Sequence, residues 1–119
     1  MASILLADDD PAMLDLAKRA LELDGHTVKT ADDGAEARAA IQAGGAFHVL
    51  VTDIQMPGVD GLTLAKAALA KHPSLKVLLI SAHADVLDGA RSLDPARVHL
   101  LAKPFPIDKL RSEVKALGG

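Results

Sequence analysis

The fold prediction starts from the segment Val49-Leu50-Val51-Thr52-Asp53-Ile54-Gln55-Met56-Pro57-Gly58-Val59-Asp60-Gly61. Its first half is apolar, which is typical of a buried strand, and the apolar run ends in a single acid. Proline and two glycines follow within eight residues of that acid, and these residues predict a loop. We therefore expect a buried strand that brings Asp53 to an exposed loop, and Asp53 is the candidate reactive residue.

Short apolar segments on both sides of this stretch predict further strands, and segments with helical spacing alternate with them. The expected strands are residues 3–7, 26–30, 47–52, 75–80 and 98–102, and the expected helices are residues 11–23, 35–43, 62–71, 85–93 and 106–117. The strand at 26–30 is the most polar and is expected at a sheet edge. The alternation predicts an α/β fold in which helices cover both faces of a doubly wound parallel sheet.

Length and composition limit the number of domains, the kinds of ligand and the location that the chain can have. The chain has 119 residues, half of them hydrophobic, and we expect a single domain spanning 1–119 with no effector domain. A net charge of −3 and only two aromatic residues argue against direct nucleic-acid binding.

The start of the chain lacks the pattern of a signal peptide, no segment predicts membrane insertion, and there is no cysteine, so we expect a cytoplasmic location. The five histidines lack metal-ligand spacing and are expected at the surface or in loops.

Polar side chains follow four of the five predicted strands. They are Asp8 and Asp9, Asp53, Ser81 and Lys103. Ligands of open parallel sheets bind outside the carboxyl ends of the strands, so these residues are expected to converge on one rim of the sheet.

The expected cluster contains three carboxylates and one ammonium group, which leaves about two negative charges unbalanced. Like charges ~4 Å apart repel by roughly 4 kcal/mol per pair at an effective dielectric constant near 20. A divalent cation would balance them, and a set of oxygen ligands favours Mg²⁺ over zinc. A carboxylate beside a bound metal can attack phosphorus, while Lys103 and the hydroxyl of Ser81 contact phosphoryl oxygens. The residues thus predict a site that receives a phosphoryl group.

These motifs resemble the receiver domain of two-component response regulators, in the CheY-like superfamily. The resemblance covers essentially the whole chain and depends on Asp8-Asp9, on Asp53 to Pro57 with Asp60-Gly61, on Ser81-Ala82, and on Lys103-Pro104-Phe105. It implies a flavodoxin-like (βα)5 three-layer sandwich with strand order 2-1-3-4-5.

The resemblance also implies roles for the acids. Asp53 would be the phosphoacceptor, and the phosphoryl group would come from a histidine kinase or a histidine phosphotransfer protein. Asp9, Asp53 and the backbone carbonyl of Gln55 would bind Mg²⁺, with Asp8 acting partly through water. Such a domain is a signalling switch that assists its own phosphorylation and dephosphorylation, and it is not an enzyme in the usual sense.

For the remaining positions, the resemblance implies that Lys103 contacts the phosphoryl group and that the Lys103-Pro104 peptide bond is cis. Ser81 would follow the phosphate, and the surface of helix 4, strand 5 and helix 5 would bind a downstream protein target. The chain would be a monomer or a weak dimer. The family usually has Tyr or Phe three residues before the lysine, where this chain has Leu100.

Other functions remain open from the residues alone. The first is a receiver that acts as a phosphorylation-independent protein-interaction module. The second is a Mg²⁺-dependent phosphohydrolase, although the acids after the first strand lack the following threonine and no cap insertion is present. The third is a flavodoxin-like carrier of FMN, in which Asp8 and Asp9 would repel the phosphate of the cofactor.

Overall fold

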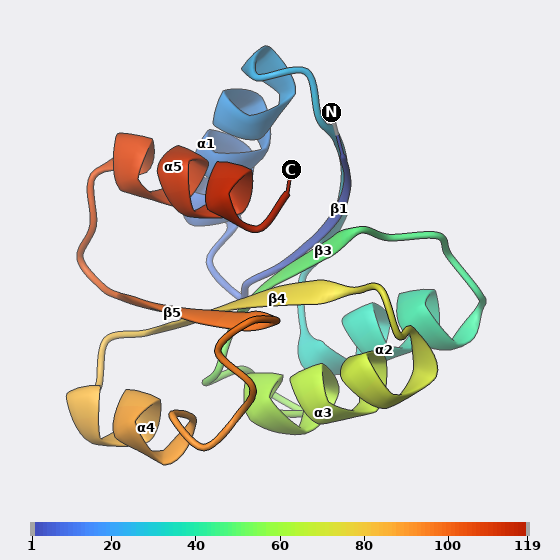
Figure 1. The fold of residues 1–119 in the computed structure, drawn as a ribbon. Coiled ribbons are helices and arrows are strands. Elements are labelled where there is room, and N and C mark those ends of the chain that lie inside the picture. Colours follow the sequence, from blue (N-terminus) through green and yellow to red (C-terminus); the bar gives the residue numbers. More distant parts are fainter. Residues whose placement is uncertain (1, 119) are drawn as a thin grey trace.

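The computed structural model describes residues 2–118, in which five strands and five helices alternate along the chain (Figure 1). The strands are β1 (Ser3–Ala7), β2 (Thr27–Ala31), β3 (Val49–Asp53), β4 (Lys76–Ser81) and β5 (Val98–Ala102). The helices are α1 (Pro11–Leu23), α2 (Gly34–Gln42), α3 (Gly61–Lys71), α4 (Ala84–Gly89) and α5 (Ile107–Ala116). All ten expected elements are present. No helix within the described residues has the length and apolar character needed to cross a bilayer.

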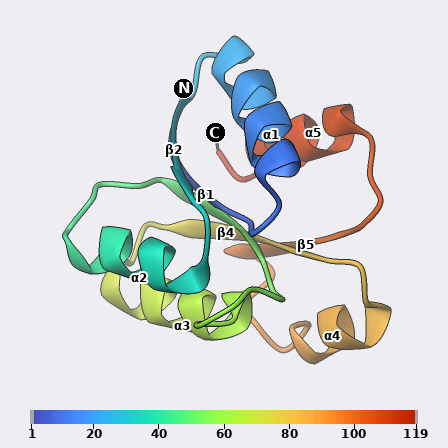
Figure 2. The ribbon, with the colours of Figure 1, turned by 180° about the vertical axis from the view of Figure 1, so that it is seen from behind.

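All strand pairs are parallel, and the strand order is β2-β1-β3-β4-β5. The predicted fold class and strand order are therefore confirmed, and the polar strand β2 lies at an edge as expected. Helices α1 and α5 cover one face of the sheet, and α2, α3 and α4 cover the other (Figures 1 and 2). These are the three layers of a doubly wound sandwich.

Two apolar cores form because successive strand residues point to opposite faces of the sheet. In β1, Leu5 belongs to the core under α2, α3 and α4, whereas Ile4 and Leu6 belong to the core under α1 and α5. Strand β3 is buried along its whole length, which explains its nearly continuous apolar sequence. Its last residue, Asp53, is thereby held at a defined position at the carboxyl end of the sheet.

Two boundaries differ most from the sequence prediction. Helix α4 ends at Gly89 instead of continuing to residue 93, because glycine is a poor helix former and the chain turns at Asp94, whose carboxylate accepts the N–H of Ala96 at 2.9 Å. Strand β3 begins at Val49, which pairs with Ile4, so Phe47 and His48 precede the ladder. An apolar run alone does not show where the neighbouring strand begins.

Arg97, just before β5, joins the start of that strand to the connection between α3 and β4. Its guanidinium donates hydrogen bonds to the backbone carbonyls of Leu69 at 3.3 Å, His72 at 2.9 Å and Leu75 at 3.0 Å. The carbonyls at the end of a helix lack partners within the helix, so this side chain satisfies groups that the helix leaves open.

We expect Arg97→Ala to lower the free energy of unfolding by about 1.5–3 kcal/mol, the usual contribution of hydrogen bonds to a charged group. Urea denaturation monitored by circular dichroism measures this change. Arg91→Ala is the matched control: Arg91 forms an exposed ion pair within its own segment, and such pairs contribute about 0–1 kcal/mol. Equal losses in the two variants would contradict the role assigned to Arg97.

Candidate functional site

Three aspartates meet at the carboxyl end of the sheet. Asp8 and Asp9 follow β1, and Asp53 is the last residue of β3. Each offers a carboxylate oxygen that lies within 4.8 Å of the oxygens of the other two. The carboxylates of residues 9 and 53 are thus close enough for a single ion to contact both, as the sequence prediction requires.

The turn between β1 and α1 orients the first acid. Asp10 caps α1, and its side chain accepts the backbone N–H groups of Ala12 and Met13. The N–H of Asp10 itself donates to Asp8 Oδ1 at 3.0 Å. Asp8 is buried and Asp9 is exposed, so the helix cap holds one carboxylate inward while its neighbour faces solvent.

The loop after β3 depends on a glycine that contacts the backbone of the site. A methyl group at Gly61 would overlap the carbonyl oxygen of Asp53 and would lie 2.7 Å from the Cα of Ile54. The N–H of Gly61 also donates to the carbonyl of Ile54 at 2.7 Å. The loop therefore folds back on the end of β3, and it can do so only because residue 61 has no side chain.

Lys103 completes the cluster from the end of β5. Its Nζ lies 2.8 Å from Asp53 Oδ2 and 3.4 Å from Asp8 Oδ2. Burial acts to lower the pKa of Lys103, but its hydrogen bond to Asp53 and the charge of Asp8 outweigh burial and raise the pKa above its usual value. The Lys103-Pro104 peptide bond is cis, as the resemblance implied.

The cluster carries an excess of negative charge. Burial raises the pKa of Asp8 above its usual value, although the N–H of Asp10 and the ammonium of Lys103 act in the opposite direction. With all three aspartates ionised, one lysine leaves two negative charges unbalanced. The chemistry of this site, three carboxylates and no nitrogen or sulfur ligand, fits a hard divalent cation that accepts oxygen ligands and keeps water.

Two other expected site residues have different surroundings. Ser81 is fully buried, and its Oγ accepts the N–H of His83 at 3.0 Å, a hydrogen bond within its own loop. The N–H of Gln55 donates to Asp53 Oδ1 at 3.2 Å, and the direction of the Gln55 carbonyl stays a prediction. The structure thus brings Asp8, Asp9, Asp53 and Lys103 together, whereas no hydrogen bond joins Ser81 to them within the described residues.

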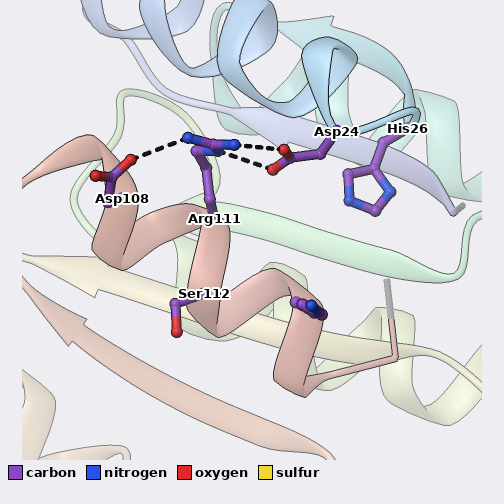
Figure 3. A pocket seen from close by; sticks show the side chains of 6 residues that line it. Asp24, His26, Asp108, Arg111 and Ser112 are labelled. Atoms are coloured by element: carbon purple, nitrogen blue, oxygen red, sulfur yellow. Dashed lines mark hydrogen bonds and ion pairs between the residues drawn. The ribbon is translucent and has the colours of Figure 1, made fainter.

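Two hollows lie near α1 and α5, and they differ in chemistry. One of about 360 Å³ opens directly beside Lys103 and is lined by Asp10, Met13, Ala82, Lys103, Pro104 and Phe105. A larger one of about 510 Å³ lies between the end of α1 and α5, where Arg111 bridges Asp24 and Asp108 (Figure 3). The larger hollow does not include any member of the aspartate cluster, so its size alone does not make it the functional site.

Comparisons with known proteins agree with the resemblance. The family model described as "Response regulator receiver domain" matches residues 4–115. The chain is 37% identical over 114 residues to the transcriptional regulatory protein TcrA of Mycobacterium tuberculosis, and the match covers 96% of this chain and 45% of TcrA. It is 38% identical over 117 residues to the response regulator receiver protein CpdR of Brucella abortus, covering 98% of this chain and 97% of CpdR.

A solved structure is also similar over nearly the whole chain. It is the response regulator TrrA of Thermotoga maritima in complex with Mg(2+)-BeF, with a TM-score of 0.85, 30% identity, and coverage of 98% of this chain and 99% of TrrA. The chain therefore spans less than half of TcrA but nearly all of CpdR and TrrA.

Proposed function

The chain belongs to the response regulator receiver domain family, and from this membership and the geometry of the aspartate cluster we propose that Asp53 accepts a phosphoryl group from a histidine kinase or a histidine phosphotransfer protein. Receiver domains are signalling switches of two-component systems and not enzymes in the usual sense. The observation that supports the role of Asp53 most directly is its position, 2.8 Å from the ammonium of Lys103 and beside two further carboxylates.

In the proposed reaction, a carboxylate oxygen of Asp53 forms a bond to phosphorus. The bond between phosphorus and the imidazole nitrogen of the donor breaks, and its electron pair stays on that nitrogen. The ammonium of Lys103 is positioned to stabilise negative charge on the phosphoryl oxygens. The apolar hollow beside Lys103 provides space next to the site for the approaching donor.

Mg²⁺ is the proposed cofactor. Asp8, Asp9 and Asp53 would hold it through carboxylate oxygens, and the backbone carbonyl of Gln55 would add a ligand. When bound, the ion would neutralise the excess negative charge and attract phosphoryl oxygens. The TrrA structure is described as a complex with Mg(2+)-BeF, which supports the same cation for this chain.

The proposed output surface consists of α4, β5 and α5 and would bind a downstream protein target. On this surface His99 Nδ1 lies 2.9 Å from Glu113 Oε2, and Lys109 lies 3.3 Å from Glu113 Oε1. Leu100 is partly buried and packs against the core under α4. A rearrangement that starts at Ser81 in β4 would reach this surface through the direct pairing of β4 with β5.

Incubation of the protein with Mg²⁺ and acetyl phosphate tests the proposed function. We expect a mass increase of one phosphoryl group that is stable in acid, labile in base, and absent when EDTA replaces Mg²⁺. Continuous release of phosphate from phosphate esters would instead indicate a phosphohydrolase, and stoichiometric binding of FMN would indicate a flavin carrier. An unmodified protein would contradict the proposal and favour a phosphorylation-independent interaction module.

Phosphorylation is expected to move the loop from Ser81 to Asp85 more than residue 100. Ser81 is buried and its Oγ is bonded to the N–H of His83, so a movement of its hydroxyl toward a phosphoryl oxygen would move this loop with it, whereas Leu100 has no ring that could exchange between a buried and an exposed position. Amide chemical shifts with and without beryllofluoride, a phosphoryl mimic, measure both responses. Shifts at Leu100 as large as those in the loop would contradict this prediction.

A further inference from the structure

The start of β1 is held by two histidine side chains, one on each side of the strand. The backbone N–H of Ala2 donates to His26 Nδ1 at 3.1 Å, and the N–H of Ser3 donates to His48 Nδ1 at 2.9 Å. His26 directly precedes β2 and His48 directly precedes β3, the two strands that flank β1. The two histidines therefore occupy equivalent positions in the sheet.

Sheet register explains why these amides need a side-chain acceptor. The ladder between β1 and β2 begins with Ser3 opposite Thr27, and the ladder between β1 and β3 begins with Ile4 opposite Val49. The amides of Ala2 and Ser3 therefore come too early for a strand carbonyl, and Ala2 is buried, so its N–H also has little access to water. An unpaired buried amide is costly, and Nδ1 of His26 removes that cost at Ala2, whereas the bond of Ser3 with His48 is exposed.

Backbone N–H groups next to both histidine rings also bind the carbonyl oxygens at the start of β1. Thr27 donates its N–H to the carbonyl of Ala2 at 2.9 Å, and His48 donates its own N–H to the carbonyl of Ser3 at 2.8 Å. Each of the first two residues described by the structure is thus bonded through both its N–H and its carbonyl oxygen. In each case the N–H bond depends on an imidazole.

These hydrogen bonds determine the protonation state of each ring. A nitrogen that accepts a hydrogen bond carries no proton, so the neutral ring must hold its proton on Nε2. Protonation of Nδ1 would place an N–H donor against the backbone N–H and would remove the bond. Protonation of either ring would therefore break its hydrogen bond to the start of β1.

The surroundings of His26 affect how readily its ring binds a proton. The ring lines the hollow between α1 and α5, together with Asp24 from the turn before β2 and with Arg111 and Lys115 from α5 (Figure 3). Burial disfavours the protonated ring and lowers the pKa of His26, whereas the charge of Asp24, whose carboxylate is also bound by Arg111, favours the protonated ring. Next to the second ring, the backbone N–H of Lys76 donates to the carbonyl of His48 at 3.0 Å, while the ammonium of Lys76 donates to the carbonyl of Ala96 at 3.3 Å.

We propose that His26 and His48 form a proton-sensitive latch, which holds the start of β1 while both rings are neutral and releases it when the rings are protonated. The latch lies at the opposite end of β1 from Asp8 and does not depend on the phosphoacceptor role of Asp53. Protonation of the two rings would weaken the central part of the sheet at the end opposite the aspartate cluster.

The burial of the His26 ring determines whether acid raises or lowers the free energy of unfolding. Burial lowers the pKa of His26 below its usual value near 6.5, so in mild acid the unfolded chain binds a proton that the folded chain does not. The contribution of neutral His26 to the free energy of unfolding is therefore fully present above pH 6.5. It decreases as the pH falls from 6.5 toward the lowered pKa of the folded chain. Each histidine that is neutral when folded and protonated when unfolded raises the unfolding equilibrium constant by up to about tenfold per pH unit.

The test uses the full chain with Met1 retained, so that Ala2 keeps a backbone amide. Imidazole ¹⁵N spectra at pH 7.5 are expected to show the Nε2–H form for both rings. As the pH is lowered, the amide resonance of Ala2 is expected to titrate together with the His26 ring, and that of Ser3 together with the His48 ring. Neutral rings with the proton on Nδ1, or amides of residues 2 and 3 that do not respond, would overturn the proposal.

Variants provide a second readout. Asparagine places an Oδ1 acceptor near the position of Nδ1 but does not titrate, so the double variant His26→Asn, His48→Asn is expected to lose the acid-dependent rise in the unfolding constant. His26→Ala removes the acceptor and is expected to unfold at a lower urea concentration already at pH 7. His83→Asn is the matched control, since the side chain of His83 forms no cap hydrogen bond, and it should keep the pH dependence. An unchanged pH dependence in the double variant would overturn the latch.

Discussion

Asp53→Asn is expected to abolish the Mg²⁺-dependent phosphorylation of this chain by acetyl phosphate. The amide oxygen of asparagine is a poor nucleophile, and the substitution also removes one of the three charges that would hold the cation. Intact-mass spectrometry after incubation measures the result, and we expect a complete loss of the base-labile adduct. The variant should remain folded, because it removes one negative charge from a cluster with two in excess and leaves Lys103 in contact with Asp8.

The control for this variant is Asp33→Asn. Asp33 caps α2 by accepting the N–H of Glu36 at 2.8 Å, and asparagine is an equally good cap, so the same chemical change occurs outside the cluster. We expect Asp33→Asn to be phosphorylated like the unmodified chain. A phosphorylated Asp53→Asn protein with an unchanged adduct would show that another residue is the acceptor.

Gly61→Ala is expected to have the second-largest effect, although residue 61 donates no group to the chemistry. The added methyl group would overlap the carbonyl oxygen of Asp53, so the end of β3 or the loop must move. Overpacking of this kind usually costs about 1–3 kcal/mol. Because the displaced residue is the proposed phosphoacceptor, we also expect weaker Mg²⁺ binding and slower phosphorylation.

Urea denaturation and Mg²⁺ titration measure the two effects of Gly61→Ala separately. The control is Gly89→Ala at the end of α4, where an added methyl group meets no atom within 4 Å. Alanine is the better helix former, so this control is expected to leave stability unchanged or to raise it by about 0.5–1 kcal/mol. Normal stability and normal phosphorylation of Gly61→Ala would contradict the positioning role of this glycine.

The location of the site could be predicted because it follows from the pattern of the strands. Apolar runs that end in Asp8-Asp9, Asp53 and Ser81, and the lysine after the fifth run, all lie at carboxyl ends of strands, and parallel strands bring those ends to one edge. The aspartate cluster and the contact of Lys103 with Asp53 agree with this reasoning.

Other features depended on contacts that no local pattern reveals. His26 was expected at the surface or in a loop, and that expectation is wrong in one respect: its side chain is buried, because it supplies the acceptor that β1 lacks. Gly61 was recognised as a loop residue, but its contact with the carbonyl of Asp53 joins residues that the sequence separates. The hydrogen bond of Ser81 with the N–H of His83 could not be foreseen from the residue type.

The layers, the strand alternation and the candidate acids could be read from the residue order, because hydrophobic periodicity and helix capping are local properties of a chain. Three features could be read only from the folded chain: which carboxylate is buried, which oxygens Lys103 contacts, and which amides the two histidines bind. Those outcomes depend on distances between segments that are far apart in the chain, and burial and electrostatic attraction act on distance in space and not on separation in sequence.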